Sequence, residues 1–177
     1  MTTLRLGTRG SRLALAQSET VAALLRAAVP GLEVELVTIT TAGDRDQTTP
    51  LPEGTGTGWF TTALQDALVA GEVDLAVHSY KDLPTKRPEG LTIAAVPLRE
   101  DPRDALVSRS GKTLKGLAAG SIIGTSSPRR EAQIRATRAD VEVRPIRGNV
   151  DTRLAKVESG EYDAIVLALA GLRRLGL

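Results

Sequence analysis

Two arginine clusters follow short apolar segments in the second half of the chain, and their residue types favour the binding of an anion. The first is Gly124-Thr-Ser-Ser-Pro-Arg-Arg130, where Ser127 is expected to be a helix N-cap and Pro128 the first helical residue. Arginines are unfavourable at a helix N-terminus, because that end of the helix dipole is positive. Their presence predicts a bound anion, whereas the simpler alternative is a pair of solvated surface arginines.

The second cluster is Arg144-Pro-Ile-Arg147-Gly-Asn149, which leads to Arg153. It again places arginine where a predicted strand ends and a predicted helix begins, which is where α/β sheets bind ligands. The planar guanidinium binds carboxylates and phosphates through two parallel hydrogen bonds. Unless these charges are scattered over the surface, they predict a ligand with several carboxylates. The arginines expected to bind it are Arg129, Arg130, Arg147 and Arg153.

A third candidate is His78-Ser-Tyr-Lys-Asp82, which directly follows the apolar run 73–77. At a strand end, the Asp82 carboxylate could stabilise a developing positive charge or move protons, with the Lys81 ammonium beside it. An ordinary surface ion pair explains the spacing of Lys81 and Asp82 at least as well. His78 is more simply a packed or hydrogen-bonded side chain.

The turn Gly7-Thr-Arg-Gly-Ser11 makes Arg9 and the Ser11 hydroxyl available to a ligand. It has neither the glycine spacing of a dinucleotide-binding fold nor the lysine of a P-loop, so nucleotide binding has no support. The run Gly54-x-Gly-x-Gly58 does not directly follow a strand, which argues against a phosphate cradle.

The composition excludes several kinds of chemistry. With no cysteine and one histidine, disulfides and thiol nucleophiles are excluded and a zinc site is improbable. Aromatic residues make up 2% of the chain, too few to stack the bases of a single-stranded nucleic acid. Residues 101–177 hold 14 basic and 9 acidic side chains, whereas residues 1–100 hold 9 and 12. The second half is therefore expected to attract anions.

The hydrophobic pattern predicts an α/β protein with a mostly parallel sheet in each half. Strands are expected at 4–7, 34–40, 73–77, 91–96, 105–108, 121–124, 141–146 and 164–169, and helices at 12–29, 61–70, 128–138 and 150–158. Ser11 is expected to cap the first helix and Gly71 to end the second. Residues 41–58 are rich in Thr, Gly, Pro and Asp and are expected to form a mobile loop over a site.

The polar, proline-containing cluster at 99–103 predicts a domain boundary, with domains at 1–99 and 100–177. No apolar run approaches the roughly 20 residues of a membrane helix, and the N-terminus has no signal peptide. The protein is therefore expected to be cytoplasmic, with neither a membrane nor a nucleic acid as partner.

These motifs, in this order, resemble porphobilinogen deaminase over essentially the whole chain. The matching segments are GTRGSRLALAQ, VHSYKDLP, REDPRDALVS, GSIIGTSSPRR, RPIRGNVDTRL and GEYDAIVLALAGLRRLGL. The resemblance implies two periplasmic-binding-protein-like (type II) domains with mixed, mostly parallel sheets that face each other across a cleft. Domain 1 would lack its C-terminal return segment, domain 2 would be incomplete at its C-terminal end, and the family's third domain would be absent.

The resemblance also implies an activity. Members of this family are transferases that join four porphobilinogen units head to tail with release of ammonia, giving hydroxymethylbilane for tetrapyrrole biosynthesis. The growing polypyrrole chain is anchored on a dipyrromethane cofactor, held by a cysteine. Asp82 would be catalytic and would also contact the cofactor. Other cofactor contacts would be Lys81, Thr125, Ser127, Arg129 and Arg130, and substrate contacts would be Arg9, Ser11, Arg147 and Arg153.

Three features depart from the family pattern. Thr57 replaces a common lysine, Pro128 replaces a common leucine, and the chain has no cysteine to hold the dipyrromethane. The chain alone is therefore expected to be inactive, and the complete enzyme to be a monomer. The alternative function is a non-catalytic, two-domain module that binds a small polycarboxylate.

Overall fold

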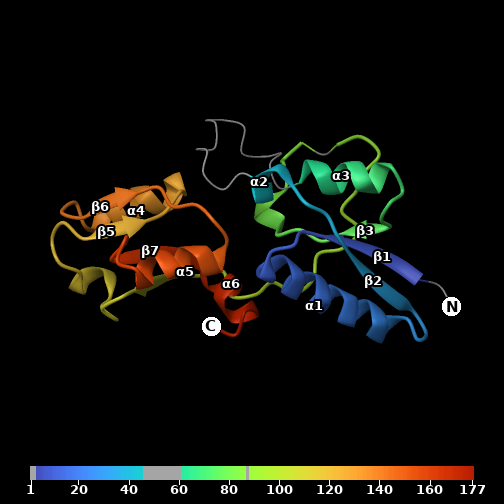
Figure 1. Cartoon of the computed structure of the whole chain (residues 1–177), viewed down its shortest axis with the longest axis horizontal. Helices are drawn as coiled ribbons and strands as arrows, with labels where there is room; N and C mark the ends of the chain where they lie inside the picture. The colour runs from blue at the N-terminus through green and yellow to red at the C-terminus, as the bar shows by residue number, and fades with distance from the viewer. Residues whose placement is uncertain (1–2, 46–60, 87) are drawn as a thin grey trace. The chain divides into compact units, whose positions relative to one another are not determined.

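The structure is a computed structural model that describes residues 3–45, 61–86 and 88–177. The chain divides into two compact units, Met1–Leu98 and Arg99–Leu177, here called unit 1 and unit 2. Each unit is an α/β layer built on its own sheet (Figure 1).

Unit 1 contains a three-stranded parallel sheet in the order β2-β1-β3. The strands are β1 (Thr3–Thr8), β2 (Glu33–Thr38) and β3 (Leu75–Ala76). Because all three strands are parallel, their carboxyl ends lie at one edge of the sheet. That edge carries the segments after β1 and after β3, which hold the predicted site residues of this unit.

The helices of unit 1 begin and end largely where the sequence predicts. Helix α1 (Arg12–Ala28) is capped by Ser11, whose Oγ accepts a hydrogen bond from the backbone N–H of Ala14 at 3.3 Å. Helix α3 (Thr62–Val69) is followed by Gly71, whose φ of +69° is the left-handed conformation expected after a helix. Helix α2 (Ala42–Arg45) is a single turn. The buried apolar side chains of this unit are Leu6, Ala22, Leu64, Ala67 and Val73.

Unit 2 contains a four-stranded mixed sheet in the order β4-β7-β5-β6. Strands β5, β6 and β7 are parallel, and edge strand β4 runs antiparallel to β7. The bounds are β4 (Asp104–Ser108), β5 (Ile122–Gly124), β6 (Glu142–Arg144) and β7 (Ala164–Ala168). The predicted fold class, α/β with mixed and mostly parallel sheets, is confirmed.

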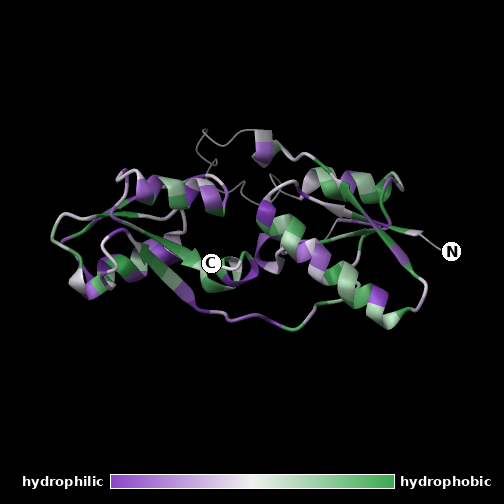
Figure 2. Cartoon of the chain, turned by 60° about the horizontal axis from the view of Figure 1, so that its bottom comes forward, coloured by the Kyte–Doolittle hydropathy of each residue, from purple (hydrophilic) through white to green (hydrophobic). Residues whose placement is uncertain are grey.

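Three helices pack on the unit 2 sheet: α4 (Pro128–Thr137), α5 (Val150–Glu158) and α6 (Leu169–Arg174). The core is made of aliphatic side chains and one aromatic residue, Tyr162, whose hydroxyl donates to the Pro145 carbonyl at 2.7 Å. Figure 2 shows the apolar residues concentrated on the sheet and a hydrophilic segment leading into β4. None of the helices in the described ranges is long and apolar enough to span a membrane.

Several local predictions were wrong. The predicted strand at 91–96 is absent, and this segment takes part in no strand pairing with the described residues. Val96 and the adjacent Leu98 are 64% and 97% exposed. Strand β3 is shorter than predicted. Helix α2 lies within the predicted loop 41–58, and residues 46–58 of that loop, including Thr57, fall outside the described residues. Ser127 occupies the N-cap position of α4, but its side chain makes no capping hydrogen bond.

Candidate functional site

The predicted site residues of unit 1 lie where β1 and β3 end. Arg9 follows β1, and His78, Lys81 and Asp82 follow β3, the last two in a 3-10 turn at Tyr80–Asp82. The backbone N–H of Val77 donates to the Gly7 carbonyl at 3.1 Å, which extends the β1–β3 pairing toward these residues. The parallel register therefore brings side chains about 70 positions apart in sequence to one edge of the sheet.

Arg9 forms a two-point ion pair with Asp44 from helix α2. Its Nε donates to Asp44 Oδ2 at 3.2 Å, and its Nη2 donates to Oδ1; both side chains are 18% exposed. The Thr41 hydroxyl also donates to Asp44 Oδ2, at 2.7 Å. Burial acts to raise the pKa of Asp44, but the hydrogen bonds from Arg9 and Thr41 outweigh it and the pKa is lowered. Asp44 is therefore an anion that holds Arg9 at the end of β1.

Asp82 is mostly buried, and its carboxylate accepts no hydrogen bond from any residue that the structure describes. Burial raises its pKa, while the positive charges of Lys81 and Arg9 oppose the rise. The predicted alternative, an exposed ion pair of Lys81 with Asp82, is not what the structure contains: Lys81 is exposed and influences Asp82 without bonding to it. Asp82 is thus a carboxylate with unused acceptor capacity beside two cations.

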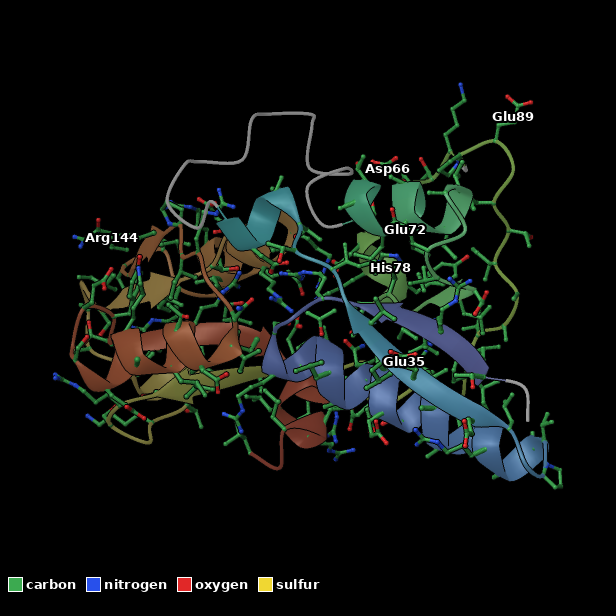
Figure 3. All side chains as sticks on the ribbon, turned by 45° about the vertical axis from the view of Figure 1, so that its right-hand side comes forward. Glu35, Asp66, Glu72, His78, Glu89 and Arg144 are labelled. Carbon is green, nitrogen blue, oxygen red and sulfur yellow. The ribbon has the colours of Figure 1, made fainter. Side chains whose placement is uncertain are left out.

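His78 lies against the strands of unit 1, as Figure 3 shows. Its Nε2 atom is buried and has no hydrogen-bond partner among the described residues. Burial, reinforced by the positive charge of Arg9, lowers the pKa of the imidazole. The neighbouring Ser79 hydroxyl lies 3.1 Å from Gln17 Nε2 of α1. Both Gln17 and Ser79 therefore reach the same edge, although the sequence analysis assigned them no role.

In unit 2 the first arginine cluster is built on the turn between β5 and α4. Thr125 is 3% exposed, its backbone N–H donates to the Arg144 carbonyl, and its Oγ1 accepts from the backbone N–H of Ser127 at 3.2 Å. The Ser126 hydroxyl donates to the Ile146 carbonyl at 2.6 Å. The turn is fixed by these bonds, and Pro128 occupies the first position of α4 as predicted.

The two arginines that open α4 have unequal environments. Arg130 is 12% exposed, donates from Nη1 to the Val166 carbonyl at 3.1 Å and pairs with Asp104 of β4. Its Nε is buried without a hydrogen-bond partner among the described residues. Arg129 is 65% exposed and meets the other oxygen of Asp104 at 3.2 Å. Arg130 is thus part of the protein interior, whereas Arg129 is open to solvent.

Arg153 and Arg147 belong to the same region of unit 2. Arg153 Nε donates to the Gly148 carbonyl at 2.8 Å, across the first turn of α5. Burial lowers the pKa of Arg153, and the charges of Arg130 and Arg147 lower it further. Arg144, by contrast, lies at the outer rim of unit 2 and pairs with Glu142 (Figure 3). Three arginines, at 130, 147 and 153, therefore share one electrostatic environment.

The structure thus brings Arg9, Lys81 and Asp82 together in unit 1 and Arg130, Arg147 and Arg153 together in unit 2. Two carboxylates that the sequence does not single out hold two of these arginines: Asp44 pairs with Arg9 and Asp104 pairs with Arg130. Asp104 directly follows the cluster at 99–103 that predicts a domain boundary, and its only sequence signal is its place in the family-like segment REDPRDALVS. In the described part of the chain, no group of three His, Cys, Asp or Glu residues could hold a metal ion.

A solved structure shares this fold. A putative LysR family transcriptional regulator from Pseudomonas aeruginosa aligns with 94% of this chain and 55% of its own length, at a TM-score of 0.50 and 17% identity. At that identity the likeness concerns the fold alone.

Sequence comparison identifies much closer relatives. The family model described as porphobilinogen deaminase, dipyromethane cofactor binding domain, matches residues 4–177. Curated porphobilinogen deaminases from Mycobacterium tuberculosis (strain H37Rv) and Syntrophobacter fumaroxidans are 58% and 53% identical over 173 residues, which is 98% of this chain. The porphobilinogen deaminase of Acidothermus cellulolyticus is 55% identical over 175 residues. The chain spans about half the length of these relatives, 55%, 56% and 52% respectively. By the family model and by these identities, the chain belongs to the porphobilinogen deaminase family.

Proposed function

We propose that this chain supplies the catalytic carboxylate and most of the cofactor and substrate contacts of a hydroxymethylbilane synthase. The reaction is the stepwise, head-to-tail condensation of four porphobilinogen units, with one ammonia released per unit added. The observation that carries the proposal is Asp82, which is mostly buried, lies within the electrostatic influence of Lys81 and Arg9, and accepts no hydrogen bond from the described residues. The Asp82 carboxylate oxygens can therefore accept hydrogen bonds from a polar group of the substrate.

The residues present fit a dipyrromethane with acidic side chains. In unit 2, Arg129 and Arg130 share one carboxylate, Asp104, so positive charge is in surplus at this pair. The buried Nε of Arg130 is a donor without a partner among the described residues. A carboxylate ligand would supply both the missing negative charge and an acceptor. The residues proposed to hold this cofactor are Lys81, Asp82, Thr125, Ser127, Arg129 and Arg130.

When bound, the cofactor supplies an anchored terminal pyrrole to which new units are added. The chain's own residues bind and orient the incoming porphobilinogen. We assign its carboxylates to Arg9, Ser11, Arg147 and Arg153. Guanidinium groups suit this task because they bind carboxylates in a fixed plane.

Asp82 acts on the reacting part of the substrate. As the C–N bond of the aminomethyl group breaks and ammonia leaves, positive charge develops on the pyrrole ring. The Asp82 carboxylate accepts the pyrrole N–H and stabilises that charge, and its mostly buried position strengthens the attraction. The ring carbon that forms the new C–C bond then loses a proton, which balances the proton taken up by the amino group as it leaves as ammonia.

The test is ammonia release from porphobilinogen by the protein that the native gene encodes. Asp82→Asn keeps the side-chain volume and removes the charge, so we expect the rate to fall by about 100-fold or more. Asp74→Asn is the matched control, because Asp74 precedes β3 at the opposite edge of the sheet, where it pairs with Arg5 at 2.7 Å. A normal rate for Asp82→Asn would refute the role of Asp82, and binding of porphobilinogen without ammonia release by the unaltered protein would favour a binding module.

We further propose that the enzyme acts as a cytoplasmic monomer on a small soluble substrate. Sedimentation velocity of the purified protein tests the oligomeric state. A mass twice that of the polypeptide would contradict this part of the proposal.

A further inference from the structure

Asp104 reaches the carboxyl edge of the unit 2 sheet from the opposite direction to its neighbours. It is the first residue of β4, and the antiparallel register pairs it with Ala168, the last residue of β7. Strand β5 is parallel to β7, so its end, and the start of α4 that follows it, lie at this same edge. The antiparallel edge strand therefore places a carboxylate where the parallel strands present arginines.

The two oxygens of Asp104 are divided between two consecutive arginines. Oδ1 accepts from Arg130 Nη2 at 2.6 Å, and Oδ2 accepts from Arg129 Nη2 at 3.2 Å. The Asp104 side chain is 28% exposed, and its pKa is lowered because the hydrogen bonds and charges of the two arginines outweigh the effect of burial. Asp104 is thus ionised at neutral pH and bridges the pair.

Arg130 depends on this bridge more than Arg129 does. It is largely buried, and its charge acts on Arg153, whose pKa it helps to lower. In the described part of the chain, Asp104 is the only carboxylate that pairs with Arg130. Without it, the repulsion between Arg130 and Arg153 would favour a different side-chain conformation, because only the bond to the Val166 carbonyl would remain.

We propose that Asp104 is a positioning residue of the ligand site: it holds the guanidinium groups of Arg130 and Arg129 side by side, so that they receive the carboxylates of a polypyrrole ligand. This inference rests on the proposed function. Asp104 itself is not a ligand contact, since a carboxylate would repel the acidic groups of such a ligand.

The sign of the change in affinity separates positioning from two other roles. If Asp104 acted only through its charge, its neutralisation would make the site more positive and tighten the binding of an anionic ligand. If Asp104 only stabilised the fold, its neutralisation would lower the unfolding midpoint and leave the affinity of the folded protein unchanged. Positioning alone predicts weaker binding when a repulsive charge is removed.

The experiment is calorimetric titration of the full chain with a synthetic dipyrromethane that bears free acetate and propionate groups, well below the unfolding temperature. We expect Asp104→Asn to raise the dissociation constant by about tenfold, the size of one charge-assisted hydrogen bond. Asp140→Asn is the matched control. Asp140 holds Arg138, which is 14% exposed, through two bonds of 2.7 Å, but it precedes β6 at the other edge of the sheet. The Asp140→Asn variant should bind the dipyrromethane with the same affinity as the unaltered chain.

Two further variants make the test independent of folding defects. Asp104→Glu keeps the charge but moves it by one methylene group. This variant should fold, and its affinity for the dipyrromethane should lie between those of Asp104→Asn and the unaltered chain. In an Arg130→Lys background, Asp104→Asn should change the affinity by less than about threefold, because the guanidinium group that Asp104 positions is no longer present.

Equal or tighter binding by Asp104→Asn, or an equal loss in Asp140→Asn, would overturn the inference and leave the proposed function standing. A full tenfold effect of Asp104→Asn in the Arg130→Lys background would overturn it as well. No binding of the dipyrromethane by the unaltered chain would contradict the proposed function and the inference together.

Discussion

Asp82 and His78 lie on the same short segment after β3, and burial favours the uncharged form of both. The pKa of Asp82 is raised and that of His78 is lowered, and Arg9 contributes to both shifts. For Asp82, Arg9 opposes the effect of burial, whereas for His78 it adds to it. One arginine therefore helps Asp82 remain a carboxylate and helps His78 remain a neutral imidazole.

His78 provides a direct test of this electrostatic environment, because it is the one histidine in the sequence. Its imidazole should titrate below the ordinary value of about 6.5 in a ¹H–¹³C NMR pH series. A depressed folded-state pKa means that the unfolded chain takes up the proton first as the pH falls. The contribution of neutral His78 to the free energy of unfolding is thus complete above about pH 6.5 and declines below that pH.

Urea unfolding at pH 7.5 and pH 5.5 measures the same effect. The free energy of unfolding should be lower at pH 5.5 for the unaltered chain, and His78→Gln should remove most of that difference. Carboxylates with lowered pKa values, such as Asp44 and Asp104, lose their contribution only at more acidic pH. An imidazole that titrates at or above 6.5 would contradict the buried, cation-adjacent position of His78.

At the scale of elements, each arginine is placed by a tight connection between a strand and a helix. Gly148 connects β6 to α5 with a φ of +105°, and its carbonyl accepts the Nε–H of Arg153. A Cβ atom at this position would lie 2.8 Å from Cβ and Cγ2 of Thr152. The turn therefore needs glycine for its conformation and for the space beside α5.

Gly148→Ala should destabilise unit 2 by about 1–3 kcal/mol, because a non-glycine residue is strained at this φ and the new methyl group also meets Thr152. Gly120→Ala is the matched control: Gly120 also has a positive φ, +76°, but its Cβ would meet no atom within 4 Å. Chemical denaturation should show a larger loss for Gly148→Ala than for Gly120→Ala. Equal losses would mean that contact with Thr152 does not matter.

The elements that could be predicted are those whose signals are local. The Ser11 cap, the Gly71 helix end and the Pro128 helix start each depend on a few neighbouring residues, and the structure has all three. The run 91–96 has strand composition, but a strand also needs a partner, and this run pairs with none of the described strands. Local pattern contains no information about that partner.

The same distinction explains the site residues that were missed. The arginines were found because strand ends followed by helix starts are visible in the sequence. Asp44 and Asp104 were not, because each meets its arginine across 25 to 35 positions of sequence. For Asp104 the contact also depends on β4 running antiparallel, which no local pattern specifies.

At the scale of the whole molecule, charge is distributed between the halves of the chain in agreement with the proposed ligand. Residues 101–177 have five more basic than acidic side chains, from 14 and 9, and residues 1–100 have three fewer, from 9 and 12. Unit 2 holds the arginine-rich edge, and unit 1 holds the single catalytic carboxylate that we propose. Most of the proposed anion-binding residues therefore lie in unit 2, while unit 1 adds Arg9, Ser11 and Lys81 beside the catalytic carboxylate.

The central claim is that the chain binds a polypyrrole through the carboxylates of that ligand. Calorimetric titration with two matched ligands tests this claim most directly. One is the dipyrromethane with free acetate and propionate groups, and the other is the same molecule with every carboxyl esterified. The free acid should bind, and the ester should bind at least about 100-fold more weakly, because each charge-assisted hydrogen bond lost costs about tenfold or more. Equal affinity for the two ligands, or binding of neither, would contradict the claim.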